Sequence, residues 1–289
     1  MKHQFRLTLI LSCAALLAGC SNPEAERAQQ LYTRAEDAFA KGQLTYASAL
    51  LDSIESDCKS AIEWRKSGHQ LSYHVQLAQQ EDSLATADTM LVTVSLMINE
   101  LIESGKFLYE KGENDDLGHY WVKGTDTRSN LGRSYIHAEV NEYGRVSLIS
   151  EYRGDAYINH TQLRLTCSDG SMVETRAVPL SNDGANYHFE NQGLRHETVT
   201  YLGEDAALSF IEMNNSDPKF RATLLYKDGA RTYPVQVNDK DLKAIALTYQ
   251  LGQMLAAQVL YTQQSKTAGG MIQFLRGKIN MNEAKQTNE

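Results

Sequence analysis

The amino-acid sequence predicts an α+β protein: an N-terminal helical hairpin and long coiled-coil helix, an antiparallel β-sandwich-like domain, and a C-terminal helix that packs back on the stem. Two observations support this order. Apolar residues recur at helical steps of three and four before residue 112 and again after residue 239. Between residues 117 and 238, short runs rich in β-branched and aromatic residues alternate with turn signals instead.

Composition excludes two classes of function. The 289 residues include 28 Lys+Arg and 36 Asp+Glu, giving a net charge of -8, and 42% are hydrophobic, as in an ordinary globular protein. No run rich in lysine or arginine is present, so we expect no nucleic-acid partner. Apart from the N-terminus, no continuous apolar segment reaches the roughly 18 residues that a membrane span needs, so we expect no polytopic membrane protein.

Residues 1–19 are predicted to be a signal peptide. Lys2 and Arg6 precede a short apolar stretch, which ends in Leu17-Ala18-Gly19-Cys20. This ending resembles the lipobox of bacterial lipoproteins. The resemblance implies cleavage before Cys20 and attachment of lipid to its thiol and to the new N-terminus, so that residues 20–23 form a lipidated anchor. Ser21 in place of an aspartate favours the outer membrane, with the periplasmic or cell-surface face left open.

Residues 24–112 are predicted to form a helical stem. A hairpin over residues 24–59 has its break at Lys41-Gly42-Gln43 and serves either to dock a partner or to fill a core. A long helix follows over residues 71–111. Its coiled-coil seam consists of Leu77, Leu84, Ala87, Leu91, Val94, Ile98 and Leu101.

The same spacing returns in a C-terminal helical segment, residues 239–277, which precedes a polar tail, residues 278–289. Each apolar stripe needs a partner. We expect the helix at about residues 240–264 to pack along the long helix of the same molecule, with Gly252, Ala256 and Ala257 permitting close approach. A monomer is therefore favoured over a dimer through the long helix.

Residues 117–238 are predicted to form the antiparallel β domain, after an acidic solvated loop at residues 113–116. Turn signals such as Asn141-Glu142-Tyr143-Gly144 and Lys227-Asp228-Gly229 separate the expected strands. The expected strands are Ser134–Val140, Val146–Tyr152, Gln162–Thr166, Thr198–Leu202, Leu208–Met213, Phe220–Tyr226 and Thr232–Val237.

The overall layout resembles a group of Bacteroidetes outer-membrane lipoproteins with no assigned activity. The features that carry the resemblance are Leu51-Asp52-Ser53-Ile54, Gly132-Arg133-Ser134-Tyr135, Glu139-Val140-Asn141-Glu142 and Tyr157-Ile158-Asn159-His160-Thr161. They extend over most of the chain after residue 20. The resemblance supports the architecture and the location, and it implies no activity.

Catalytic and metal-binding motifs are missing from the sequence. It contains no signature of zinc, redox, serine-hydrolase or nucleotide chemistry, and its histidines are scattered singly. We therefore expect no enzyme activity, no metal and no cofactor. One enzymatic alternative is a carbohydrate-active hydrolase using Glu139, Glu142 and Glu151, since glycoside hydrolysis needs two carboxylates held across a cleft.

Aromatic residues of the β domain are the candidate ligand contacts, because exposed rings stack on sugar faces or on peptides. We single out Trp121, Tyr135 and Tyr143. Ser53, Ser83 and Thr89 each follow an aspartate and precede an apolar residue. These triplets resemble the protein O-glycosylation site of Bacteroidetes, although such residues are also common on the polar faces of helices. Cys58 and Cys167 lie in different predicted domains, so two separate buried thiols are favoured over a disulfide.

Together these observations predict a non-enzymatic envelope lipoprotein anchored by lipid on Cys20. Its helical stem acts as a spacer, and its β domain binds an envelope protein or a glycan. The structural alternative is a periplasmic scaffold in which the hairpin and stem assemble with other envelope proteins.

Overall fold

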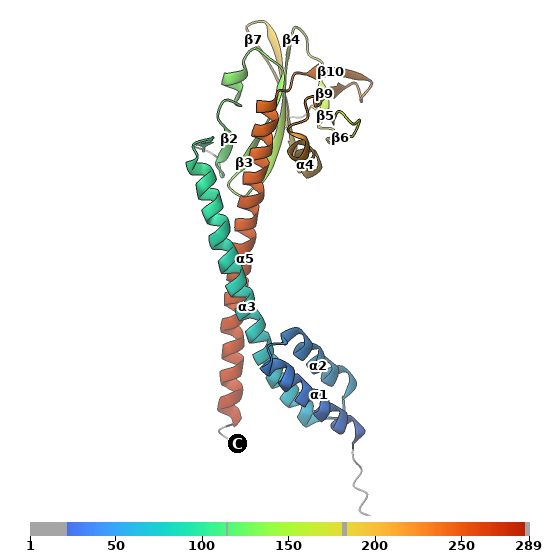
Figure 1. Ribbon diagram of the computed structural model, residues 1–289, viewed down its shortest axis with the longest axis vertical. Coiled ribbons are helices and arrows are strands. Elements are labelled where there is room, and N and C mark those ends of the chain that lie inside the picture. The colour runs from blue at the N-terminus through green and yellow to red at the C-terminus, as the bar shows by residue number, and fades with distance from the viewer. Residues whose placement is uncertain (1–21, 114, 181–183, 287–289) are drawn as a thin grey trace, which may run out of the picture. The chain divides into compact units, whose positions relative to one another are not determined.

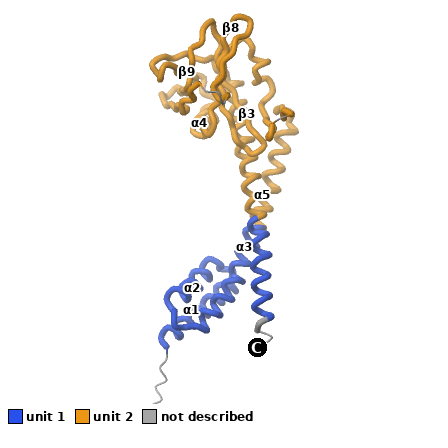
Figure 2. The backbone as a smooth tube through the Cα atoms, turned by 180° about the vertical axis from the view of Figure 1, so that it is seen from behind, with its two compact units in different colours: residues 1–84, 267–289 blue, residues 85–266 orange. Residues whose placement is uncertain are grey.

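The computed structural model describes residues 22–113, 115–180 and 184–286 (Figure 1). The predicted signal peptide 1–19, the predicted lipidation site Cys20 and the last three residues of the predicted polar tail lie outside the described residues. The chain divides into two compact units (Figure 2): residues 1–84 with 267–289 form unit 1, and residues 85–266 form unit 2. Helices α3 (Ile62–Glu103) and α5 (Asp239–Gln286) contribute to both units, so the boundaries differ from the predicted ones.

Unit 1 contains the predicted helical hairpin, formed by α1 (Pro23–Ala40) and α2 (Leu44–Asp57). The side chain of Asn22 caps α1 by accepting a hydrogen bond from the backbone N–H of Glu24. Gly42, with φ 71°, makes the turn between the helices. The core of the hairpin is built from small residues, which let helices approach closely, together with Leu50, Leu51 and Ile54 from α2. The small buried residues are Ala28, Ala35, Ala38 and Ala47.

Both long helices differ in length from the prediction. α3 starts at Ile62 and ends at Glu103 instead of Lys111, because Gly105 takes a left-handed conformation (φ 70°) that stops the helix. α5 continues to Gln286, through most of the predicted polar tail. In unit 1 its apolar spacing is extended by buried residues that the prediction overlooked, namely Ala268, Ile272, Leu275 and Ile279.

By length and composition alone, α3 is apolar enough to cross a membrane, and little of its apolar stretch is buried. This finding corrects the expectation that no internal segment qualifies. That expectation counted continuous apolar runs, whereas threonines, a serine and the two acidic residues Asp88 and Glu100 interrupt this stretch without lowering its mean hydropathy below that of a candidate span. A single helix of this kind is weak evidence for a membrane span, and Ile98 in the same stretch packs against Leu251 and Leu255 of α5.

Unit 2 contains two antiparallel sheets, and together with the five α-helices of the described residues they confirm the predicted α+β class (Figure 1). The six-stranded sheet has the order β1 (Phe107–Glu110), β2 (His119–Val122), β3 (Tyr135–Asn141), β4 (Val146–Gly154), β8 (Leu194–Leu202) and β7 (Asn186–Asn191). The four-stranded sheet has the order β10 (Arg231–Val235), β9 (Arg221–Tyr226), β5 (His160–Thr166) and β6 (Met172–Glu174).

Several predicted strands need correction. The run Leu208–Met213 lies in helix α4 (Asp205–Asn214), which buries Ala207, Leu208 and Ile211. Short apolar runs do not distinguish a strand from a buried helix, and here the spacing of the buried residues is helical. Strands β1, β2, β6 and β7 were not predicted. The first of these lies within the range predicted for the stem.

The core of unit 2 lies between the two sheets. Leu148, Val199 and Tyr201 from the six-stranded sheet pack with Leu163 and Leu224 from the other sheet. Helix α4 and the first turns of α5 complete this cluster with Leu208, Ile211, Leu242, Ile245 and Tyr249. α5 thus covers the inner face of the six-stranded sheet at β3 and β4 (Figure 1).

The predicted pairing of the two long helices within one molecule is confirmed in this unit. Gln258 of α5 donates a hydrogen bond to Ser95 of α3 (3.0 Å). Ser95 lies about one helical turn before the buried seam residue Ile98. Of the predicted small residues, Gly252 and Ala256 contact the turn between β3 and β4. A Cβ on Gly144, in the turn between β3 and β4, would lie 2.3 Å from the carbonyl oxygen of Gly252. Gly252 therefore admits this turn, not the long helix.

Candidate functional site

A groove of about 660 Å³ opens on the outer face of the six-stranded sheet, at its β1–β2–β3 edge. The strand register places Leu108 opposite Trp121 and Glu110 opposite His119, so that these four side chains form its floor with Glu139 of β3. The short 3-10 helix η1 (Thr127–Asn130) and the loop before β2 supply its walls. The wall residues are Gly112, Asp115, Asp126, Thr127, Arg128 and Ser129.

The wall at η1 is held by its own side chains. Asp126 caps the short helix, because its carboxylate accepts hydrogen bonds from the backbone N–H (3.1 Å) and the hydroxyl (2.9 Å) of Ser129. Burial raises the pKa of Asp126, but these hydrogen bonds outweigh burial and lower the pKa overall. Asn130 donates to the carbonyl oxygens of Gly124 and Asp126 and accepts from Arg133, which fixes the segment against the sheet.

The groove carries a negative charge. Four carboxylate side chains line it, against a single arginine, Arg128. Glu139 Oε2 lies 3.8 Å from His119 Nδ1 on the neighbouring strand. Asp115, predicted to lie in a solvated boundary loop, is one of the four acids. We call this feature the acidic groove. It disfavours anionic ligands and suits neutral or cationic ones.

Of the three predicted ligand contacts, only Trp121 lies in the acidic groove. Its ring is half-buried, and its indole N–H is buried without an acceptor among the described residues. Tyr143 is 53% exposed in the β3–β4 turn and does not line the groove. Trp121 is therefore the aromatic platform of this site.

Tyr135 is the prediction that the structure corrects, because only 1% of it is exposed. Its ring stacks on His137 at 5.1 Å, and the guanidinium of Arg133 lies over it at 5.2 Å. Burial raises the pKa of its hydroxyl well above the ordinary value. The segment that leads from η1 into β3 covers the ring, so it does not meet a ligand from outside.

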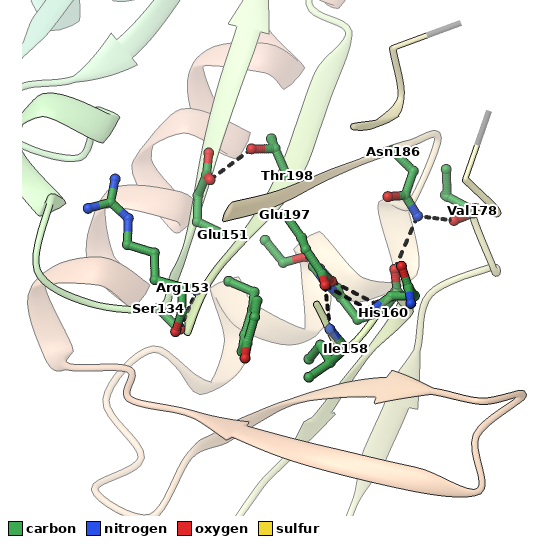
Figure 3. Close-up of polar contacts among 12 residues, drawn as sticks. Ser134, Glu151, Arg153, Ile158, His160, Val178, Asn186, Glu197 and Thr198 are labelled. Atoms are coloured by element: carbon green, nitrogen blue, oxygen red, sulfur yellow. Dashed lines mark hydrogen bonds and ion pairs between the residues drawn. The ribbon is translucent and has the colours of Figure 1, made fainter. Parts of the chain in front are cut away.

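The predicted carboxylate trio does not converge. Glu139 lies in the acidic groove, whereas Glu142 accepts hydrogen bonds from the Tyr109 hydroxyl (2.8 Å) and the Gly118 N–H (3.2 Å). Glu151 is buried and accepts a hydrogen bond from Thr198 (2.9 Å; Figure 3). Glu139 and the strand position opposite Glu151 are four residues apart on β3, which is about 13 Å along the strand. Glycosidase carboxylates lie roughly 5 to 10 Å apart.

The predicted glycosylation sites lie on helices. The hydroxyls of Ser53, Ser83 and Thr89 each donate a hydrogen bond of 2.8 Å to the carbonyl oxygen four residues earlier. Ser83 and Thr89 are exposed and Ser53 is half-buried. Cys58 and Cys167 are free and buried, one in each unit, and burial raises the pKa of both thiols.

Sequence reasoning missed a buried polar network between the two sheets. Ser150 Oγ lies 2.8 Å from His160 Nε2. His160 Nδ1 lies 2.7 Å from Glu197 Oε2 (Figure 3). Asn159, with φ 58°, turns the backbone so that the N–H groups of residues 158, 159 and 160 all donate to the same carboxylate. Burial raises the pKa of Glu197, but the hydrogen bonds from His160 and the backbone lower it overall.

This order of groups is that of a serine-hydrolase triad, but the surroundings are not those of an active site. Ser150, His160 and Glu197 are completely buried, and the Ser150 hydroxyl also lies 3.1 Å from the Tyr201 hydroxyl. None of the three lines the acidic groove. Ser150 on β4 and Glu197 on β8 belong to one sheet, and His160 on β5 belongs to the other. The network therefore joins the two sheets by hydrogen bonds. Only the fold brings these residues together, so no sequence pattern marked them.

Comparison of this chain with protein-family models, with curated proteins and with solved structures finds no match.

Proposed function

We propose that this protein is a non-enzymatic lipoprotein of the outer membrane, anchored by lipid on Cys20, whose unit 2 binds a neutral glycan in the acidic groove. The observation that carries the proposal is the position of Trp121 on the floor of a groove rich in carboxylates. An indole face stacks on the apolar face of a sugar ring, and carboxylates accept hydrogen bonds from sugar hydroxyls. In this proposal the helices act as a spacer between the membrane and unit 2.

The size and charge of the groove favour this class of ligand. A volume of about 660 Å³ lies within the range of small-molecule sites, and the groove opens to solvent at a sheet edge, as binding to part of a longer chain requires. Uronic or sulfated sugars would meet four carboxylates and one arginine there. A basic peptide is the competing ligand, because it would satisfy the charge without needing the indole.

A printed array of neutral plant, fungal and host glycans tests the proposal, with basic peptides printed beside them. The probe is the full-length chain in a non-ionic detergent. We expect retention on one class of neutral glycan that persists in 0.5 M NaCl, about three times physiological ionic strength, because stacking and neutral hydrogen bonds are screened little. Retention only on basic peptides, lost at high salt, would contradict the proposal.

A periplasmic scaffold is the second candidate, and one observation favours it. Between Asp88 and Glu100, α3 carries no charged residue, yet Val92, Leu96 and Met97 are at least half exposed. Surface helices normally present charged residues to water, so this face suits contact with another protein. Protease added to intact cells separates the two candidates. Cleavage of unit 2 before the outer membrane is opened supports glycan binding at the cell surface, whereas protection favours the scaffold.

A further inference from the structure

The lipid proposed for Cys20 places one end of unit 1 at the membrane surface. The described chain starts at Asn22, two residues after Cys20, and two residues of extended chain span at most about 7 Å. Asn22 is tied to the loop between α2 and α3, because its side-chain amide donates a hydrogen bond to the Ser60 hydroxyl at 3.0 Å. The start of α1 and the start of α3 therefore both lie close to the attachment point. We call Asn22 and residues 59–64 the anchor end.

The anchor end carries an apolar side chain that the fold does not use. Ile62 is the first residue of α3 and is 69% exposed, although it directly follows the buried Ala61. It belongs to none of the apolar clusters of the described residues. The first turn of a helix favours acidic side chains, which the helix dipole stabilises. A single exposed isoleucine is common on protein surfaces, but this one lies where the chain is attached to the bilayer.

The position of Ile62 is fixed by its neighbours. Cys58 and Ala61 belong to the buried core of the hairpin, and the backbone N–H of Ala61 donates to the carbonyl oxygen of Cys58 at 3.0 Å. Ser60 donates to the Glu24 carboxylate of α1 through both its backbone N–H and its hydroxyl, each at 2.7 Å. The loop before α3 is therefore held from both sides, and it presents Ile62 in one defined direction.

Two aromatic side chains lie close to Ile62. Trp64, on the same turn of α3, packs against Tyr32 of α1 with ring centroids 5.5 Å apart, and both residues are only half-buried. Tryptophan and tyrosine are enriched at membrane–water interfaces, because the ring is apolar and its N–H or O–H group stays hydrated. An exposed isoleucine beside such a pair suits the boundary between lipid and water.

Net charge does not explain a membrane contact here. Lys59 and Lys66 are exposed around the anchor end, but so are Glu26 and Glu63. The two signs balance, so anionic lipids gain little from this surface. A contact made by apolar and aromatic side chains should therefore form on a zwitterionic membrane.

We propose that the anchor end is a membrane-contacting surface, in which Ile62 inserts into the phospholipid layer beside the lipid on Cys20. Trp64 and Tyr32 then lie at the level of the headgroups. This inference rests on the lipid anchor of the proposed function and does not depend on what the acidic groove binds. A lipidated residue holds the chain at one point, and the contact at Ile62 adds a second, which orients unit 1 on the membrane.

The fluorescence of Trp64 tests the contact directly. The chain contains two tryptophans, so Trp121→Phe leaves Trp64 as the only one. The full-length lipidated chain is reconstituted into phosphatidylcholine vesicles whose acyl chains are either ordinary or brominated, because bromine quenches tryptophan only at close range. We expect the brominated lipid to quench Trp64. Trp64→Phe, which leaves Trp121 in unit 2, is the matched control and should show no quenching.

Ile62→Ser tests the inserted side chain. Burial of an isoleucine favours the inserted state about tenfold or more, so this variant should lose most of the quenching of Trp64. Val92→Ser is its matched control, because Val92 is also β-branched and 61% exposed on α3 but lies in unit 2, and it should keep the quenching. If Trp121→Phe does not fold, the difference in quenching between the wild type and Trp64→Phe gives the same quantity.

Flotation of the vesicles distinguishes the two ways in which the result can be negative. A chain that does not float with the vesicles has no lipid anchor, which overturns the proposed attachment and this inference together. A chain that floats, but whose Trp64 emission is the same in ordinary and brominated vesicles, overturns the contact alone. Equal quenching of Trp64 and Trp121, or equal losses in Ile62→Ser and Val92→Ser, also overturns the contact.

Discussion

Arg133, in the segment that enters β3, forms a two-pronged ion pair with Asp241 in the first turn of α5, with contacts of 2.7 and 2.6 Å across 108 residues of sequence. The Asp241 side chain is only 6% exposed and that of Arg133 27%. The same arginine also holds Asn130, the last residue of η1. The wall of the acidic groove is therefore tied to the helix that carries the core of unit 2.

We predict that Arg133→Met lowers the free energy of unfolding by about 2 to 3 kcal/mol, because it leaves the Asp241 carboxylate buried without its partner. Urea denaturation followed by circular dichroism measures the loss. Arg164→Met removes a more exposed pair with Glu174 and should cost under about 1 kcal/mol. Equal losses of unfolding free energy in the two variants would show that the Arg133–Asp241 pair stabilises the protein no more than an exposed ion pair does.

The buried Glu197 should make stability depend on pH. Its pKa in the folded protein is lowered from the ordinary 4.5, so its contribution is complete above that pH and is lost as the pH falls toward the folded pKa. Glu197→Gln should be less stable at pH 7 and should lose part of the decline below pH 4.5. Unfolding free energies measured at intervals from pH 7 to pH 3 test this. An identical acid decline in wild type and Glu197→Gln is the contrary outcome.

Gly144 should tolerate alanine worse than Gly170 does. Both have positive φ (77° and 86°), so both variants suffer backbone strain of about 1 kcal/mol. At Gly144 the new Cβ would also meet the backbone of α5 at 2.3 Å, whereas at Gly170 nothing lies within 4 Å. Thermal unfolding should therefore place Gly144→Ala well below Gly170→Ala. The close approach of the β3–β4 turn to α5 is refuted if the two variants melt together.

Lipid attachment gives a prediction at a single residue. Cells fed an alkyne-bearing fatty acid should label the wild-type chain, and Cys20→Ser should abolish the label because the thiol is the acceptor. Cys58→Ser is the matched control, since that thiol is buried in unit 1, and it should keep full labelling. Label that is retained in Cys20→Ser, or lost only in Cys58→Ser, would contradict lipid attachment at Cys20.

The sequence predicted elements whose apolar spacing is long and regular. The hairpin, the pairing of α3 with α5 and most strands of unit 2 follow from local patterns, and so does the turn at Gly144. The run Leu208–Met213 was too short to decide between strand and helix. Ala268 and Ile272 continued a pattern that was stopped too early.

The sites were less predictable because they depend on contacts distant in sequence. Trp121 was found as an aromatic residue of the β domain, but its place in a groove depends on the η1 wall, which Arg133 and Asp241 hold. Tyr135 is likewise an aromatic residue on a strand, and only the contacts of Arg133 and His137 with its ring make it part of the interior. The pairing of His160 with Glu197 exists only once the two sheets are packed together.

We propose above that the acidic groove binds a neutral glycan through Trp121. Its most direct test is calorimetric titration of the full-length chain, in detergent, with the neutral glycan that the array retains. We predict that Trp121→Ala weakens binding about tenfold or more through loss of ring stacking, while Tyr143→Ala, which removes an exposed ring outside the groove, binds like wild type. Unchanged affinity in Trp121→Ala, or an equal loss in Tyr143→Ala, would contradict it.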